Sequence, residues 1–248
     1  GANALLLEDL SHLRMVDFAT GCNPQETEVV IHHLAQLHLG WWDKPRLQTL
    51  PWLRSFGQDA EERQAKFQNW WRLVPQKYAT CLPGHQLPTS FIELGQRFGQ
   101  HAARIFTQLA EPPLTCVHAD THVLNLFFGV QTGDPPLRLI DWQATRLGRA
   151  MIDVTYFMVT SVPTDQRRQI EQVVVQHYYQ LIKTHNLTDY SWQQCWLDYR
   201  RAAFWPLSVI ASVTALLSMT SKRRRTLLQI WFQRLVAFSE DHALVELL

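Results

Sequence analysis

Hydrophobic residues recur every three to four positions over most of the chain, which is the spacing that gathers them on one face of an α-helix. The first such segment has a clear start, with Asn23 suited to cap the helix, Pro24 at its first position and Glu26 in its first turn. The pattern predicts helices over 24–40, 59–78, 88–109, 150–160, 165–185, 191–218 and 222–247. We therefore expect a mostly helical chain.

Short apolar runs interrupt this pattern in the middle of the chain and predict three buried strands, at 114–117, 126–128 and 137–140. The residues 131–136 between the last two are rich in turn formers, so a hairpin should bring Asp141 back towards Asn125. The apolar run 5–10 resembles an edge strand, although no partner strand is predicted in the next hundred residues. The expected fold class is α+β, mostly α.

The composition is that of a globular protein without a charged partner surface. The 248 residues are 46% hydrophobic and 18% charged, and the net charge of +1 gives no support to nucleic acid or an anionic membrane as partner. The segment 202–220 has 19 uncharged positions, close to the length that spans a bilayer. It contains Pro206 and is flanked by basic residues on both sides, so we interpret it as a buried helix and expect no membrane contact.

The four cysteines are Cys22, Cys81, Cys116 and Cys195, and no two of them have a paired spacing. Cys116 lies within a predicted buried strand, where a thiol behaves as a small apolar group. The first residues lack the basic and then apolar pattern of a signal peptide. We therefore expect reduced cysteines and a cytoplasmic protein.

The candidate chemistry is concentrated after the first predicted strand, where His118, Asp120, His122 and Asn125 lie within eight residues. One interpretation is phosphoryl transfer, which needs a carboxylate to orient or deprotonate a hydroxyl and oxygen ligands for magnesium. Asp120 would then be the base and Asn125 and Asp141 the magnesium ligands. His118 would orient the loop through hydrogen bonds.

Two other interpretations remain open at this stage. His118, Asp120 and His122 on an extended segment would point to one side and could hold zinc or iron in a metal-dependent hydrolase. Alternatively, the polar residues could be ordinary turn and capping residues with no chemical role.

The spacing His118–Ala119–Asp120 followed by Asn125, then Asp141–Trp142–Gln143 and then Asp153, resembles a known family. It is similar to the phosphotransferases that include aminoglycoside kinases and choline kinases, and to their ecdysteroid-kinase-like branch. These proteins share the protein-kinase-like fold. The resemblance implies transfer of a phosphoryl group from ATP, with Mg²⁺, to a hydroxyl of a small molecule.

The resemblance also implies a role for each matching residue. Asp120 would be the catalytic base, within a catalytic loop that includes His118 and Asn125. Asn125 and Asp141 would bind magnesium, and Asp153 would brace the loop through its backbone. The family commonly has glycine at position 119, and we expect Ala119 to adopt an ordinary backbone conformation instead.

The same resemblance divides the chain into a hinge at 1–10 and a C-terminal lobe at 11–248, with the catalytic loop and metal site in 114–156 and a helical part in 157–248. The nucleotide-binding residues of the hinge would be Glu8, Asp9 and Leu10. We expect the N-terminal β lobe to be absent, because no glycine-rich loop precedes the hinge and the first lysine is Lys44. The chain alone should then transfer phosphate poorly, and a non-catalytic, pseudokinase-like binding module is the alternative.

The acceptor is only weakly indicated by the sequence. Ten tryptophans favour an apolar or sugar-like ring, and the absence of an acid-rich stretch gives no support to a polycationic acceptor. The resemblance places Asp198 and Tyr199 near the acceptor. No feature of the sequence indicates an oligomeric state.

Overall fold

The structure is a computed structural model that describes residues 6–184, 190–217 and 221–248. Its helices are α1 Pro24–Trp41, α2 Ala60–Trp71, α3 Val74–Cys81, α4 Thr89–Gln108, α5 Met151–Ser161, α6 Thr164–Lys183, α7 Trp192–Ala202, α8 Phe204–Leu216 and α9 Lys222–Asp241. Its strands are β1 Arg14–Met15, β2 Thr115–Val117, β3 Leu126–Phe128, β4 Leu137–Leu139 and β5 Arg146–Gly148. Short 3₁₀ helices cover Pro45–Thr49, Val123–Asn125, Trp142–Ala144 and Leu244–Leu247. The predicted mostly helical α+β fold with small sheets is confirmed.

Two small antiparallel sheets carry the strands. One has the order β1-β3-β4, and the other pairs β2 with β5. In the β3–β4 hairpin, Leu126 lies opposite Leu139 and Phe128 lies opposite Leu137, so the predicted hairpin is confirmed. At the other edge Met15 of β1 lies opposite Phe127.

The predicted strand at 5–10 is wrong for the residues that the structure describes. Residues 6–10 have no regular secondary structure, and the side chains of Leu6 and Leu7 are 97% and 75% exposed. Leu5 lies outside the described residues. The edge of the sheet is formed instead by β1, four residues further along the chain.

Two predicted long helices are each divided in two. The segment 59–78 forms α2 and α3, and Pro75 lies in the first turn of α3, where its missing N–H leaves no hydrogen bond unmade. The segment 191–218 forms α7 and α8, separated at Ala203, and Pro206 lies in the first turn of α8. The predicted end of that segment, residue 218, lies outside the described residues. Helix α9 ends at Asp241 rather than at 247, because Ala243 has a left-handed backbone with φ of 46°.

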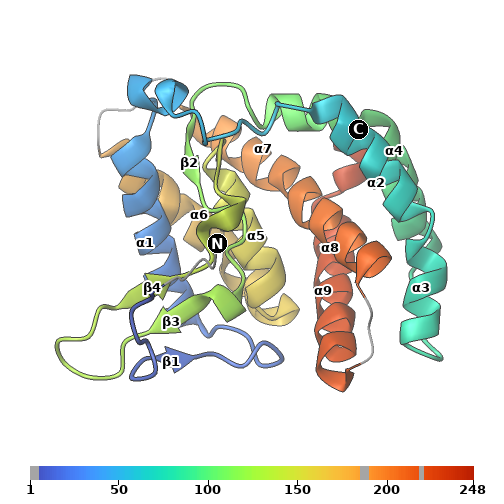
Figure 1. The fold of residues 1–248 in the computed structure, drawn as a ribbon, viewed down its shortest axis with the longest axis horizontal. Coiled ribbons are helices and arrows are strands. Elements are labelled where there is room, and N and C mark those ends of the chain that lie inside the picture. The colour runs from blue at the N-terminus through green and yellow to red at the C-terminus, as the bar shows by residue number, and fades with distance from the viewer. Residues whose placement is uncertain (1–5, 185–189, 218–220) are drawn as a thin grey trace, which may run out of the picture.

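Helix α5 forms the centre of the molecule. Figure 1 shows α1 and α6 on one side of it, α8 and α9 on the other, and α2, α3 and α4 at the outer edge. Every residue of α5 is buried, as expected for a helix that is apolar on all faces. Its one acidic residue, Asp153, is therefore buried as well, beside the loop that follows β2.

No helix in the described ranges is long and apolar enough to cross a bilayer. Helix α8 contains much of the uncharged stretch, but at 13 residues it is only about 20 Å long, against a hydrocarbon core of about 30 Å. The four cysteines form no disulfide bond.

Candidate active site

The loop between β2 and β3, residues 118–125, is held in place by Asp153. The Asp153 carboxylate accepts the backbone N–H of His118 at 2.8 Å and that of Ala119 at 2.7 Å. In return, the hydroxyl of Thr121 donates to the Asp153 carbonyl oxygen at 2.8 Å. These bonds fix the loop against the first turn of α5, as the resemblance implied for Asp153.

A buried histidine on α1 completes this support. His38 Nε2 lies 3.1 Å from Asp153 Oδ2, and Nδ1 lies 2.7 Å from the hydroxyl of Tyr178 on α6. The hydroxyl of Thr115 donates to the His38 carbonyl oxygen at 2.8 Å. The sequence reasoning did not identify this role of His38, and the only signal was a polar residue on the apolar face of its helix.

His118 connects the loop to the hairpin. Its Nε2 lies 2.8 Å from the carbonyl oxygen of Ile140, which can only accept, so Nε2 carries the proton. Its Nδ1 then accepts the backbone N–H of Asp120 at 3.3 Å. The ring also packs edge-on against Trp142 at a centroid distance of 4.7 Å. His118 therefore orients the loop, and neither of its ring nitrogens has a lone pair left for a metal ion.

The hydrolase interpretation has no geometric support. Among the residues that the structure describes, no three His, Cys, Asp or Glu side chains are arranged to hold a metal ion. His118 and His122, two of the three proposed ligands, each accept a backbone N–H on Nδ1.

Asp120 lies at the surface end of the loop, with 21% of its side chain exposed. The carboxamide nitrogen of Asn125 lies 3.1 Å from its Oδ2, and His122 Nε2 lies 3.4 Å from its Oδ1. Burial alone would raise the pKa of Asp120, but hydrogen bonds from His122 and Tyr156 outweigh it and lower the pKa below its ordinary value. The carboxylate is therefore ionised at neutral pH and can accept a hydrogen bond from a hydroxyl.

The hairpin brings Asn125 and Asp141 together, as predicted. The backbone N–H of Ile140 donates to the Asn125 carbonyl oxygen at 3.1 Å, so Asp141 follows directly beside Asn125. The Asn125 carboxamide nitrogen is used by Asp120, and within the described chain its side-chain oxygen has no hydrogen-bond partner. The Asp141 side chain is exposed, with Gln143 Nε2 at 3.3 Å. A neutral oxygen beside a carboxylate is a donor set that suits magnesium.

The backbone at two of these positions is left-handed. Ala119 has φ of 65°, so the expectation of an ordinary conformation there is wrong. Its N–H is bound by Asp153, and its carbonyl oxygen accepts the indole N–H of Trp205 at 2.8 Å. These two bonds offset a steric cost of about 1–2 kcal/mol for a non-glycine residue. Asp141 also has φ of 65°, which aspartate tolerates better than most residues.

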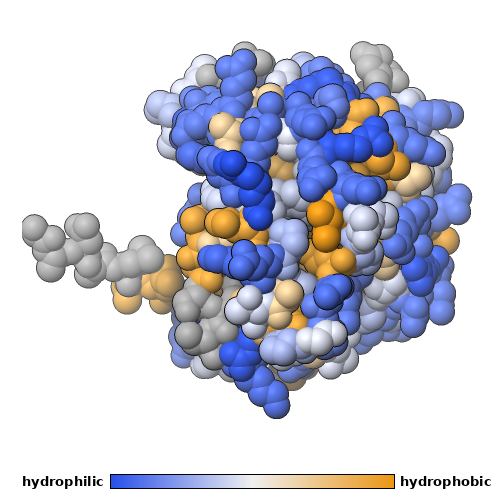
Figure 2. Space-filling view, turned by 90° about the vertical axis from the view of Figure 1, so that its right-hand side faces the viewer, coloured by the Kyte–Doolittle hydropathy of each residue, from blue (hydrophilic) through white to orange (hydrophobic). Residues whose placement is uncertain are grey.

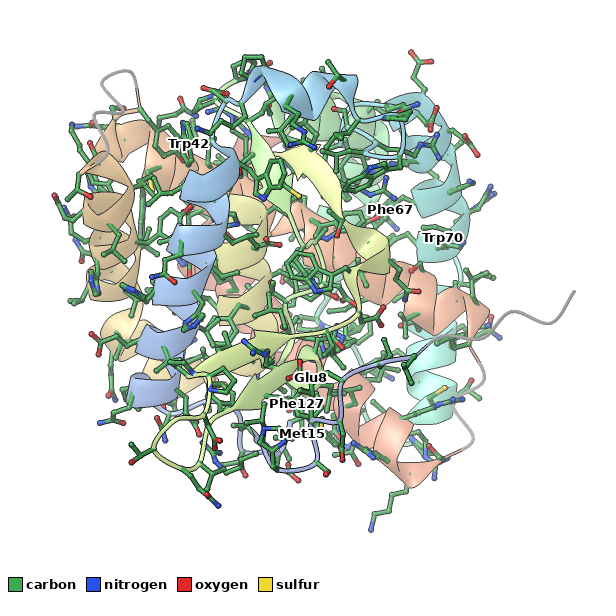
Figure 3. All side chains as sticks on the ribbon, turned by 60° about the vertical axis from the view of Figure 1, so that its left-hand side comes forward. Glu8, Met15, Trp42, Phe67, Trp70 and Phe127 are labelled. Carbon is green, nitrogen blue, oxygen red and sulfur yellow. The ribbon has the colours of Figure 1, made fainter. Side chains whose placement is uncertain are left out.

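A cavity of about 750 Å³ lies beside Asp141. Most of its wall is apolar, and Glu8 and Leu10 from the predicted hinge line it together with Phe127 of β3. Figure 3 shows Glu8 and Phe127 next to each other at the small sheet. Asp9, the third predicted nucleotide-binding residue, is not part of this cavity. It accepts the backbone N–H of Ser11 at 2.9 Å, a bond that lowers the pKa of its carboxyl group.

Asp198 and Tyr199 belong to the core and not to a binding surface. Both are fully buried. Asp198 is bound by the hydroxyl of Tyr190 at 3.0 Å and lies 3.3 Å from Arg149. Neither side chain is therefore exposed to contact an acceptor, and their position near the acceptor stays a prediction.

Comparison with known families identifies the class of protein to which this chain belongs. The model of the ecdysteroid kinase-like family matches residues 1–190, and the chain therefore belongs to this family. This confirms the resemblance inferred from the sequence motifs. Among solved structures, a putative aminoglycoside phosphotransferase from Ralstonia eutropha is similar, with 14% identity and a TM-score of 0.46 over 90% of this chain and 70% of that chain. No curated protein matches the sequence.

Proposed function

We propose that this protein is a small-molecule kinase that transfers a phosphoryl group from ATP to a hydroxyl group, with magnesium. In this proposal the chain is the C-terminal lobe of a protein-kinase-like fold, with its hinge at 1–10. One observation carries the proposal. The loop fixed by Asp153 places the Asp120 carboxylate beside Asn125, and the hairpin places Asp141 beside Asn125 at the rim of an apolar cavity.

Asp120 acts on the acceptor. Its lowered pKa keeps it ionised, so it can accept a hydrogen bond from the attacking hydroxyl and hold that oxygen in line with the phosphorus. A carboxylate of low basicity is sufficient, because the transition state of phosphoryl transfer is loose and the proton leaves late. The bond from Asn125 Nδ2 at 3.1 Å and the His122 ring at 3.4 Å hold the carboxylate in position.

Asn125 and Asp141 would hold the magnesium ion through the carboxamide oxygen and the carboxylate. When bound, magnesium neutralises charge on the nucleotide phosphates. His118 keeps the two ligands in register, because it joins the loop that contains Asn125 to Ile140, the residue before Asp141.

The cavity beside Asp141 suits the nucleotide base and sugar. Leu7, Leu10, Phe127 and Leu139 give it apolar walls on which a flat ring can pack. Glu8 lies at the same cavity and offers an acceptor to an amino or hydroxyl group. Its carboxylate lies 3.7 Å from the guanidinium of Arg138 at the cavity wall.

Nucleotide binding by this chain tests the metal site directly. We expect ATP to bind more tightly with Mg²⁺ than with EDTA, and Asp141→Asn to remove this difference while binding in EDTA stays unchanged. Isothermal titration calorimetry measures both. Asp165→Asn is a matched control, because Asp165 is 94% exposed on α6 and remote in sequence from the site. Nucleotide binding that ignores both Mg²⁺ and Asp141→Asn would contradict the proposed metal site.

Turnover tests the catalytic role. We expect Asp120→Asn to lower kcat by about 10²-fold or more, because the positioned carboxylate is lost. Nucleotide binding should persist in this variant. Full turnover in Asp120→Asn would contradict the proposal, and tight nucleotide binding with no transfer to any acceptor would favour a non-catalytic binding module.

A further inference from the structure

A second pocket, of about 350 Å³, lies between α2, α8 and β5 and shares no lining residue with the cavity beside Asp141. Four cationic side chains and two carboxylates line it, which leaves an excess of two positive charges. These six residues are Arg54, Arg63, Lys66, Arg146, Asp59 and Glu62. We refer to it as the basic pocket. Trp70 of α2, which is labelled in Figure 3, lines the pocket. Figure 2 shows that hydrophilic residues predominate on the outer face of α2–α4.

Long-range backbone contacts bring the arginines together. Leu147 of β5 donates its N–H to the Arg54 carbonyl oxygen at 2.9 Å, which places Arg54 beside Arg146. Arg63 approaches from α2, and its guanidinium lies over the rings of Phe56 and Trp205 at 5.6 Å and 5.9 Å. The aromatic rings hold the orientation of Arg63, and Arg146 is half-buried, whereas Arg54 and Lys66 are more than half exposed.

Two of the four cations already have partners. Arg54 forms an ion pair with Asp59, and Lys66 pairs with Glu62 at 2.6 Å. The other two are Arg63 and Arg146. Within the described chain, Arg63 Nη1 and Arg146 Nε are buried and have no hydrogen-bond partner.

A buried guanidinium nitrogen without an acceptor is costly, and two of the four such nitrogens in the described residues lie at this pocket. Burial, together with the charge of Arg146, lowers the pKa of Arg63 to about 10. Burial and the nearby Arg54 also lower the pKa of Arg146. The two carboxylates that line the pocket pair with Arg54 and Lys66 and do not neutralise Arg63 and Arg146. The remaining positive charge favours binding of an anion.

The basic pocket borders the catalytic loop. Trp205 forms part of its wall, and the indole N–H of the same residue donates to the carbonyl oxygen of Ala119 at 2.8 Å. Ala119 directly precedes Asp120. A molecule in the pocket is therefore separated from the loop that carries the proposed base by a single side chain.

We propose that the basic pocket binds a carboxylate or phosphate group of the acceptor, and that the substrate is accordingly an anionic small molecule with a hydroxyl group. This inference rests on the proposed kinase function and adds the class of substrate to it. The planar fork of a guanidinium matches both kinds of anion. The pocket volume is suited to a small metabolite or to its charged end. The same positive charge disfavours a polycationic acceptor.

Anion binding tests the pocket without any nucleotide. Inorganic phosphate and malate are titrated separately into the chain by calorimetry at constant ionic strength. We expect saturable binding of at least one of them, weakened about tenfold or more by Arg146→Gln, because a charge-assisted bond is lost. Arg97→Gln is the matched control, since Arg97 is an exposed arginine on α4 away from both cavities, and it should change the affinity less than about twofold.

Arg63→Gln should weaken anion binding in the same way, but it also removes packing against aromatic rings. Arg63→Lys keeps the charge and should bind anions with intermediate affinity, and melting temperatures identify any variant that fails to fold. Absence of saturable binding for both anions would overturn the inference. Unchanged affinity in Arg146→Gln with a normal melting temperature would overturn it as well.

Nucleotide binding in the same variants separates the two proposals. ATP with Mg²⁺ should bind equally well to the wild type, to Arg146→Gln and to Arg97→Gln, because neither arginine lines the cavity beside Asp141. If ATP binds and neither anion does, the basic-pocket inference fails and the kinase proposal stands. If an anion binds at Arg146 and ATP does not, the kinase proposal fails, and with it the assignment of the pocket to an acceptor.

Turnover with matched acceptors then identifies the anion. Glycerol 3-phosphate is compared with glycerol, and lactate with lactamide. We expect the charged member of one pair to have a kcat/KM at least about tenfold higher, and Arg146→Gln to remove this preference through a higher KM. A consistent preference for the neutral members would overturn the inference.

Discussion

Asp153 holds the largest share of the hydrogen bonds that shape the candidate site. Its carboxylate accepts the backbone N–H groups of His118 and Ala119 and lies 3.1 Å from His38 Nε2. The side chain is fully buried, and each of its oxygens has a partner. A buried carboxylate satisfied in this way is stabilising only while every donor remains opposite an oxygen.

Asp153→Asn should therefore destabilise the protein. One oxygen becomes an NH₂ group that faces a backbone donor, and we expect a loss of about 2–4 kcal/mol in the free energy of unfolding. Urea unfolding followed by circular dichroism measures this change. Asp165→Asn is the control and should cost less than about 1 kcal/mol, because that side chain is exposed. A change below about 1 kcal/mol in Asp153→Asn would show that the loop does not depend on this carboxylate.

The lowered pKa of Asp120 gives a pH-dependent prediction. A carboxylate whose pKa is lower in the folded state contributes stability that is present above its ordinary pKa of about 3.9 and is lost as pH falls through the folded value. Burial opposes this lowering, and His122 supplies the largest favourable contributions. In His122→Ala the pKa of Asp120 should rise, so the acid limb of kcat/KM moves to higher pH.

Carbon-13 NMR titration of the Asp120 carboxyl group measures the shift directly. His85→Ala is a suitable control, because His85 is exposed in the loop between α3 and α4. An unchanged or lower pKa of Asp120 in His122→Ala would mean that another group holds the carboxylate ionised.

The residues of the candidate site could be predicted from the sequence where they lie within one motif. His118, Asp120 and Asn125 lie within eight positions, and a turn signal places Asp141 near them. His38 and Trp205 could not be predicted, because they reach the loop from distant parts of the chain, through Asp153 and the Ala119 carbonyl. The left-handed backbone of Ala119 has the same origin, since it is fixed by these long-range bonds and not by the local sequence.

At the scale of elements, the packing of α2 against α4 depends on a glycine. A Cβ atom at Gly95 of α4 would lie 1.9 Å from the ring of Trp71 on α2. The Trp71 indole N–H donates to the Ile92 carbonyl oxygen at 3.1 Å, which keeps the ring over the glycine. The close approach of these two helices therefore requires the absence of a side chain at position 95.

Gly95→Ala and Gly40→Ala form a matched pair that tests this packing. Both glycines lie in helices, and alanine is favoured there by up to about 1 kcal/mol. A Cβ atom at Gly40 would meet no other atom within 4 Å, so Gly40→Ala should be neutral or slightly stabilising. Gly95→Ala should destabilise by about 1–3 kcal/mol, because overcrowding outweighs helix propensity. Thermal and urea unfolding measure both, and equal effects in the two variants would contradict the helix contact.

The elements themselves were largely predictable from hydrophobic periodicity, and their interruptions were not. Each predicted helix is present, yet Pro75 and Pro206 lie in first turns, where proline is compatible with the helix that follows it. The pattern of apolar residues continues across both breaks. Strands β1 and β5 were missed because two or three residues cannot show an alternating pattern, and each depends on a partner distant in the sequence.

At the scale of the whole molecule, the proposed chemistry depends on one core. Helix α5 supports the loop through Asp153, and α1 contributes His38, which contacts Asp153. Helix α8 contributes Trp205, which binds the carbonyl oxygen of Ala119. The two cavities lie beside elements that pack on this core, one at the small sheet and the other between α2 and α8. Global unfolding should therefore expose the core and dismantle the site in one transition.

Three buried cysteines report on the interior from different elements, Cys22 and Cys195 in the main core and Cys116 in a smaller cluster with Leu47, Leu53 and Leu147. Cys22 precedes α1, Cys116 lies in β2 and Cys195 lies in α7, and all three are buried. Burial raises the pKa of the Cys22 thiol to about 12, with Glu26 adding to the effect, and that of Cys195 to about 12. Burial, with Asp153 nearby, raises the pKa of Cys116 to about 11. Cys81, near the end of α3, is only partly buried.

We therefore expect a single thiol to react rapidly with iodoacetamide in the native protein at pH 8, and all four in urea. The three buried thiols are protected twice, by inaccessibility and by their small thiolate fraction, so their reaction requires unfolding. Mass spectrometry of the intact protein counts the labels, and Cys81→Ser should remove the rapid one. If the core unfolds as a unit, the three slow sites acquire label at one common rate of opening. Earlier labelling of Cys116 would instead mean that the β2–β5 sheet beside the catalytic loop opens on its own, and the site would then be held less firmly than its hydrogen bonds indicate.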